Sequence, residues 1–429
     1  MLRCAFVLVV LLCFSNSTWG ASPGVSPDPR TLLIPEAELN RARDLVQQLG
    51  SEQYAEREQA EISLSQMGRL ARPALLEAVS NDTNAEVRSR CRGLLPKATT
   101  LELKARLAVF LADAEGQFEH DLAGWNEFRS LVRNQWSLFG YPVWVDRSLD
   151  SEARKLFAEM ISTQANRQIL FAIGTKQSEL GSLAANRRQE LYWQKYPRQV
   201  FVGGVPRPPV TRRDPTMSDI LTLLVLETQV GEHFAPPRNA PITTLMSTSG
   251  FTSAVSGDDA HSKVCRAVIN AWFDTRHDPM EMYQALNLAN NVGLPDHAGN
   301  LAIRLFQSKG APIIYRGMAA ATLVRLNNKN HIPLLEKAMT DNGIVYTIRK
   351  PLPGKPVGEW ESHEIQLRDV ALAVSLILTQ QKPEDYGFVD QQRGNGNPGT
   401  NYNYTRLYLP EKQRDAAFAK WKEWREKNP

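Results

Sequence analysis

The chain has few of the residues from which catalytic and metal-binding sites are built. It contains seven histidines and four cysteines among 429 residues, and the histidines are scattered. No nucleophile elbow stands between an expected strand and helix. His363-Glu364 begins like a zinc-protease motif, but position 367 is leucine where the second histidine would stand. We therefore expect no catalytic residues, no metal centre and no cofactor.

Long apolar runs are also missing from the rest of the chain beyond its N-terminal segment. No run there approaches the roughly 20 residues that span a bilayer. The N-terminus itself has the pattern of an export signal. Arg3 precedes a short apolar run at 5–14, and the small residues Thr18 and Gly20 indicate cleavage after Gly20. The alternative is an uncleaved membrane anchor. Cleavage predicts a secreted or periplasmic protein without a membrane span.

Cleavage would leave two cysteines, Cys91 and Cys265. In an oxidising compartment they could form a disulfide. Each also lies on the apolar side of an expected helix, where a buried free thiol is common. The chain is 42% hydrophobic and 22% charged, with a net charge of +4. These values are typical of a folded globular protein and do not indicate sequence-specific nucleic-acid binding.

One helical pattern occurs twice, far apart in the chain. Residues 60–82 read AEISLSQMGRLARPALLEAVSND, and residues 319–341 read AAATLVRLNNKNHIPLLEKAMTD. Apolar residues at i, i+4 and i+7 predict a first helix in each copy, and Gly68 and Pro73 mark the turn to a second helix. The identical pairs are Ala60/Ala319, Leu64/Leu323, Leu75/Leu334, Leu76/Leu335, Glu77/Glu336 and Asp82/Asp341. Such repetition is typical of helical-repeat proteins.

A third helix is expected from about Ala85 to Leu95, and it also has a distant counterpart. The matching residues are Glu86, Val87, Arg90 and Leu94 in the first copy and Glu364, Ile365, Arg368 and Leu372 in the second. The second copy carries an insertion in which apolar and polar residues alternate around Pro351–Pro356. This alternation predicts a two-stranded hairpin at 343–362, with an irregular surface excursion as the alternative.

At these residues the chain resembles the HEAT-like helical repeats of secreted bacterial proteins. The resemblance lies in a first helix with a small residue four before a leucine, a short turn, a second helix with Leu-Leu, and a closing Asp. It covers about 50–100 and 296–380. It implies an α-solenoid used for protein–protein contact and transfers no catalytic residue. We therefore expect a mainly α fold of stacked antiparallel helix pairs with irregular loops and one small β-hairpin.

The expected organisation has five parts and a terminal cap. The signal peptide at 1–20 is followed by a linker at 21–35, N-terminal HEAT-like repeats at 36–134, an irregular helical middle with long Pro/Gly/Ser loops at 135–262, and C-terminal HEAT-like repeats at 263–429. A helix at 410–427 has one apolar and one charged side, as the last layer of a repeat array requires.

Candidates for metal ligands are Asp258, Asp259 and His261, which stand together where a loop meets an expected helix. Carboxylates and imidazoles bind metals, but either aspartate is more simply an N-cap. Asp296 is expected to cap a later helix in the same way. The string GNGNPG at 394–399 matches a dinucleotide fingerprint without its strand and helix, so a turn is expected there.

Arginines bracket a proline-rich segment at 196–216 and are candidate binding residues. They are Arg187, Arg188, Arg198, Arg207, Arg212 and Arg213. A solvated charged face is the ordinary interpretation, and contact with an anionic polymer or an acidic partner is the functional one.

The leading hypothesis is an exported helical-repeat scaffold that binds a protein or polymer partner, because such arrays present extended surfaces. Two alternatives remain open. One is a hydrolase, with or without a metal, whose site lies in the loops 196–216 and 231–262. The other is a module that binds an anionic polymer through the arginines.

Overall fold

The computed structural model describes residues 26–113, 115–134, 147–197, 212–231, 236–351, 360–390 and 407–428, together with short strands at 137–138, 141–142, 201–202 and 205–206. The expected signal peptide and the string at 394–399 lie outside the described residues. Over these described residues the fold is mainly α, with 73% helix and small two-stranded antiparallel sheets. Contacts divide the chain into two compact units, Met1–His120 and Asp121–Pro429.

The described residues of the first unit form four α-helices: α1 (Glu36–Gln48), α2 (Tyr54–Met67), α3 (Arg72–Asn81) and α4 (Ala85–Ala112). Gly68 ends α2 with a φ of 59°, a left-handed conformation that glycine adopts readily. Pro73 lies in the first turn of α3, and the Asn84 side chain caps α4 by accepting from the Glu86 backbone N–H. The helices share one apolar core that includes Leu49, Ala60, Leu64, Leu75, Val87 and Cys91.

The first copy of the repeated pattern does not form one helix pair. The most extensive contacts join α1 to α2 and α3 to α4, and further contacts join α1 to α3 and α2 to α4. Residues 60–82 therefore contain the second helix of one packed pair and the first helix of the next. The sequence predicted the two helices correctly but paired them wrongly. The expected pair was α2 with α3, whereas the observed pairs are α1 with α2 and α3 with α4.

A buried carboxylate closes the first unit. Asp113 ends α4, is fully buried, and accepts hydrogen bonds from the backbone N–H groups of Gln117 and Phe118. Its Oδ2 lies 2.9 Å from Nε2 of His120. Burial opposes ionisation of Asp113, but these hydrogen bonds outweigh it and lower the pKa to about 2. The carboxylate thus fixes the chain as it leaves α4.

The second unit begins with helices arranged around one buried helix. Its members are α5 (Trp125–Asn134), α6 (Arg147–Ser162), α7 (Gln164–Thr175), α8 (Leu180–Lys195), α9 (Met217–Thr228), α10 (Ile242–Met246), α11 (Ser249–Ser256) and α12 (Ala260–Asp274). A capping box between Thr216 and Asp219 starts α9. The apolar side chains from Ile220 to Leu226 are buried, because α6, α7, α8, α11 and α12 all contact this helix.

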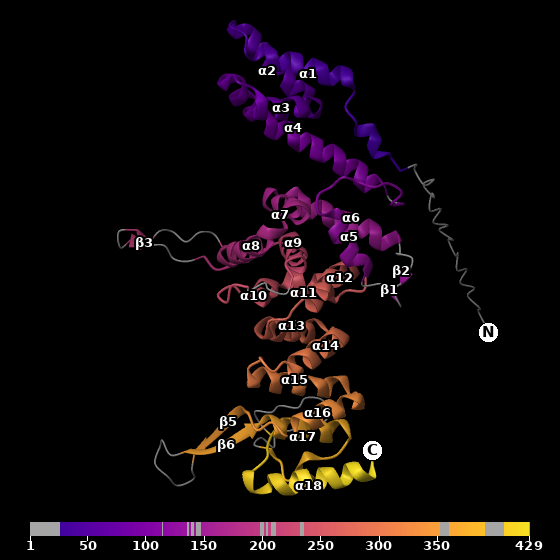
Figure 1. Cartoon of the computed structure of the whole chain (residues 1–429), viewed down its shortest axis with the longest axis vertical. Coiled ribbons are helices and arrows are strands. Elements are labelled where there is room, and N and C mark those ends of the chain that lie inside the picture. The colour runs from indigo at the N-terminus through magenta and orange to yellow at the C-terminus, as the bar shows by residue number, and fades with distance from the viewer. Residues whose placement is uncertain are drawn as a thin grey trace, which may run out of the picture. The chain divides into compact units, whose positions relative to one another are not determined.

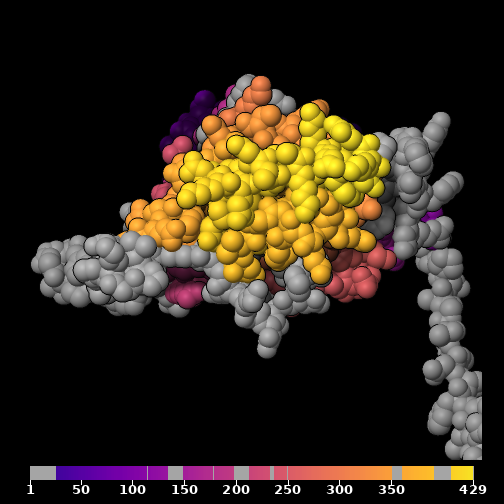
Figure 2. All heavy atoms as spheres, turned by 90° about the horizontal axis from the view of Figure 1, so that it is seen from below, coloured from indigo at the N-terminus to yellow at the C-terminus, as the bar shows by residue number. Residues whose placement is uncertain are grey.

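The remaining helices are α13 (Pro279–Val292), α14 (Pro295–Gln307), α15 (Ile313–Leu326), α16 (Ile332–Ala338), α17 (Leu367–Leu378) and α18 (Glu411–Lys427). Among them α14 packs on α13 and α15, and α17 packs on α15, α16 and α18; Figure 1 shows these helices following one another toward the C-terminus. Figure 2 shows α18 lying across the end of the unit. Ala417 and Trp421 of α18 share an apolar cluster with Leu372 and Leu376 of α17. A C-terminal helix with these properties was predicted at 410–427.

The second copy of the pattern is also divided between pairs, because α15 packs on α14 and α16 packs on α17. The first helices of the two copies agree, since Leu64 and Leu323 are both buried. On the second helices the most deeply buried leucine is Leu75 in one copy and Leu335 in the other, whereas Leu76 is half-buried. In the sequence alignment of the two copies, Leu75 is matched to Leu334 and not to Leu335. The burial of the second helices therefore agrees only when the alignment is shifted by one residue.

A hairpin interrupts the helices where alternation predicts one. Strands β5 (Ile344–Pro351) and β6 (Trp360–Gln366) pair antiparallel, from Ile344 opposite Gln366 to Pro351 opposite Trp360. The strand continues beyond the expected end at 362. Glu364 and Ile365 were matched to a helix start, and this match is wrong, because Ile365 is fully buried as part of the strand and α17 begins at Leu367.

Short elements complete the fold. The other antiparallel pairs are β1 (Ser137–Leu138) with β2 (Tyr141–Pro142), β3 (Phe201–Val202) with β4 (Val205–Pro206), and β7 (Val389–Asp390) with β8 (Leu407–Tyr408). Turns of 3-10 helix lie at Pro29–Leu32, Gly68–Ala71, Gln177–Glu179, Lys329–His331 and Pro383–Tyr386. The structure therefore contains more hairpins than the single one expected.

Candidate functional site

Two of the three residues suspected of metal binding, Asp259 and His261, have other partners. The Asp259 side chain accepts a hydrogen bond of 2.8 Å from the backbone N–H of Ser262, which confirms its interpretation as the N-cap of α12. That hydrogen bond lowers the pKa of Asp259. Nδ1 of His261 lies 3.1 Å from Oε1 of Glu152, and Asp258 is exposed. The residues that the structure describes contain no group of three or more His, Cys, Asp or Glu placed to hold a metal ion.

The predicted arginine patch is wrong for its first two members. Arg188 is fully buried, and Arg187 is 6% exposed and donates to Asp219 at 2.8 Å. Arg212 and Arg213 are exposed, and the Arg212 guanidinium lies 5.5 Å from the ring centroid of Tyr196. Arg198 and Arg207 lie outside the described residues. Two of the six arginines therefore cannot contact a polymer from the surface.

Arg188 instead belongs to a buried ionic cluster. It donates to both carboxylate oxygens of Glu227, at 2.9 and 2.7 Å, and to both of Glu281, at 2.8 and 2.9 Å. Trp272 Nε1 donates to Glu227 at 2.7 Å, and Arg276 donates to it at 3.3 Å. The cluster joins α8, α9, α12 and α13. With its groups paired and away from solvent, the cluster links these helices in the interior and is not accessible to a ligand.

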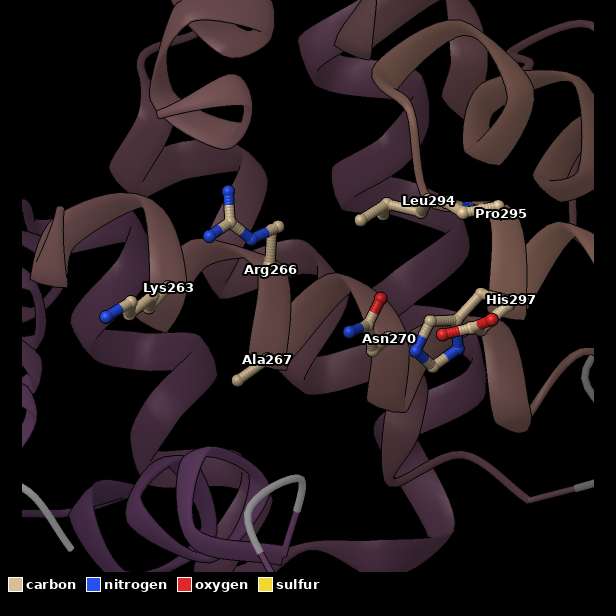
Figure 3. Close-up of a pocket in the computed structure, with 8 residues that line it drawn as sticks. Lys263, Arg266, Ala267, Asn270, Leu294, Pro295 and His297 are labelled. Carbon is tan, nitrogen blue, oxygen red and sulfur yellow. The ribbon is translucent and has the colours of Figure 1, made fainter. Parts of the chain in front are cut away.

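The candidate site is a cleft between α12 and the start of α14, of about 260 Å³. Its lining residues are Lys263, Arg266, Ala267 and Asn270 of α12 and Leu294, Pro295, Asp296 and His297 at the start of α14. The α12 residues are spaced i, i+3, i+4 and i+7, so they share one face of the helix. Figure 3 shows Lys263 and His297 at opposite ends, with Ala267 and Asn270 between them. The cleft follows α12 for two turns, about 10 Å.

Several polar groups in this cleft lack partners. Asn270 Oδ1 and His297 Nδ1 are buried atoms with no hydrogen bond in the described structure. The Lys263 ammonium group likewise contacts no acceptor among the described residues. A buried polar atom without a partner costs about 1–3 kcal/mol. A ligand that supplied these partners would recover that free energy on binding.

The charges in the cleft are unevenly placed. Lys263 and Arg266 are half-buried cations, and Arg266 Nη1 is held by the carbonyl oxygens of Val255, at 2.8 Å, and Gly257. Asp296 is exposed and lies in the first turn of α14. It is not the predicted N-cap, because Leu294 occupies that position and Pro295 starts the helix. One end of the cleft is therefore cationic, and the other carries a carboxylate.

The sequence did not single out Lys263, Arg266 or Asn270. Their spacing along one helical face could have been read, but it is typical of any amphipathic helix. The second wall of the cleft comes from α14, whose packing against α12 no local pattern predicts.

No helix in the described part of the chain has both the length and the apolar character needed to cross a bilayer. The sequence matches no protein-family model, and comparisons with curated proteins and with solved structures found no significant match.

Proposed function

We propose that the chain is an exported helical-repeat scaffold, an α-solenoid of HEAT-like design, that binds a protein partner. The observation that carries the proposal is the packing order of the second unit. There α14 packs on α13, α15 on α14, and α17 on both α15 and α16, before α18 ends the series. Each helix buries its apolar side on neighbours, which leaves a long side of the array for contact.

Exposed apolar side chains near the starts of two of these helices support a protein partner. Met280 of α13 is 42% exposed and Ile314 of α15 is 38% exposed. The Tyr315 hydroxyl donates to Met280 Sδ at 3.2 Å, and the rings of Tyr283 and Tyr315 stack at 4.5 Å. Aromatic residues and methionine are enriched in the cores of protein interfaces.

Photo-crosslinking in the native host tests the proposal. A photoreactive phenylalanine analogue replaces Met280 or Ile314 in the full chain, and Lys427 on α18 serves as the exposed control position. We expect both test positions to give an adduct with the same protein, and the control position to give none. If no discrete adduct formed from either test position, the scaffold proposal would be wrong.

A further inference from the structure

We propose that the cleft between α12 and α14 takes an acidic side chain from an extended segment of the partner protein. The inference rests on the proposed function and gives the partner a chemical feature. The carboxylate lies at the end formed by Lys263 and Arg266, and the adjoining peptide backbone lies at the end formed by Asn270 and His297.

Charge fixes which end receives the carboxylate. The Lys263 ammonium has no acceptor in the described chain, and only Nη1 of Arg266 is occupied by carbonyl groups. Hydrogen bonds between a cation and a carboxylate are stronger than neutral ones. At the opposite end the carboxylate of Asp296 would repel a second anion. An acidic side chain therefore fits beside Lys263 and not beside Asp296.

At the other end of the cleft, two buried atoms without hydrogen-bond partners indicate which ligand group binds there. Asn270 Oδ1 needs a donor, which a peptide N–H supplies. His297 Nδ1 also needs a partner, and when protonated it donates to a peptide carbonyl. A peptide group carries one donor and one acceptor, so it satisfies both side chains together.

The dimensions suit an extended chain. Two helical turns separate Lys263 from Asn270 along α12, about 10 Å. An extended chain rises about 3.3 Å per residue, so two or three residues span the cleft. Ala267, a small side chain that is 2% exposed, lines the cleft between the ends. The volume of about 260 Å³ is below that of a drug-sized ligand site, and it fits one side chain of a partner whose bulk lies outside.

Binding of a short probe to the full chain tests this assignment. The probes are acetyl-Gly-Asp-Gly-Gly-amide and its Asn analogue, titrated in low salt and followed by saturation-transfer NMR. We expect a Kd of about 1 mM for the Asp peptide and binding at least about fivefold weaker for the Asn peptide. Because both probes meet the unmodified protein, this comparison does not depend on any variant folding.

Variants locate the binding. Lys263→Gln should weaken the Asp peptide about fivefold, and it should leave the Asn peptide unchanged because only the charge interaction is lost. Lys337→Gln, an exposed lysine on α16, is the matched control and should change neither value. Equal binding of the two peptides, no binding of either, or equal effects of both lysine variants would each overturn the assignment.

The two proposals fail separately. If Met280 crosslinks its partner equally in the Lys263→Gln protein and the peptides are not distinguished, the cleft assignment is wrong and the scaffold stands. If the peptides are distinguished as expected but no partner crosslinks, the scaffold proposal is wrong and the cleft is a site of another kind.

Discussion

The buried cluster around Arg188 gives a sharp prediction for the stability of the second unit. The perturbation is Arg188→Met, which keeps an unbranched side chain and removes the charge. Four charge-assisted hydrogen bonds to Glu227 and Glu281 disappear with the guanidinium. Glu281 is then left with Arg276 as its nearest cation, at 3.7 Å.

The magnitude follows from burial. Side chains of Arg188 and Glu227 have no exposed surface, and that of Glu281 is 5% exposed. Removing one partner of a buried ion pair costs about 3–5 kcal/mol, because the remaining charge stays desolvated. For a unit of this size each kcal/mol lowers the melting temperature by about 2–3 °C, so we expect a decrease of about 6–15 °C.

Differential scanning calorimetry of the full chain provides the measurement. Lys427→Met is the control, because both side chains of the Lys427–Glu423 ion pair are exposed to solvent. The melting temperature of this variant should equal that of the unmodified protein. Glu281→Gln in the Arg188→Met background should restore part of the loss by removing the unpaired charge. A decrease of less than about 2 °C for Arg188→Met would refute the reasoning.

Three further predictions concern the core and its titratable groups. Leu75→Asp should destabilise the first unit by about 3–5 kcal/mol in urea, and Leu76→Asp by clearly less, because only Leu75 is fully buried. Asp113→Asn should lower stability by about 2 kcal/mol at pH 6. Since the folded pKa of Asp113 is lowered to about 2, this difference should shrink as the pH falls from 4 toward 2, and a pH-independent difference would contradict it. Burial raises the pKa of Cys91 to about 11 and that of Cys265 to about 12, so iodoacetamide at pH 8 should modify neither thiol until the protein unfolds, as peptide mass spectrometry would show.

Local features of the helices could be predicted from the sequence. Gly68 and Pro73 mark the turn between α2 and α3, and Asp259 caps α12, because each acts through backbone groups a few residues away. The alternation around 343–362 likewise predicts the hairpin of β5 and β6. Periodicity also identifies α18, whose apolar side packs on the preceding helix.

Features that depend on distant contacts could not be predicted. Nothing near Arg188 shows that it is buried, because its partners Glu227 and Glu281 are 39 and 93 residues away in the chain. The pairing of helices failed for the same reason. The pattern over two consecutive helices indicates which face of each helix is apolar. It does not indicate which other helix packs against that face, because the partner is set by contacts with distant parts of the chain. The cleft could not be predicted either. The residue spacing of α12 indicates only one of its walls, and the other wall is formed by the start of α14.

Hydrogen exchange of a Trp421→Ala protein tests most directly whether the second unit is an array held together layer by layer. Trp421 is 4% exposed and packs into the cluster at the end of the array, whereas Lys422 of the same helix is exposed, so Lys422→Ala is the control. We predict that Trp421→Ala speeds exchange in α16, α17 and α18 and leaves α9, α12 and α13 protected, because each layer depends on its neighbours. Equal loss of protection in α9 and α17 would contradict the account.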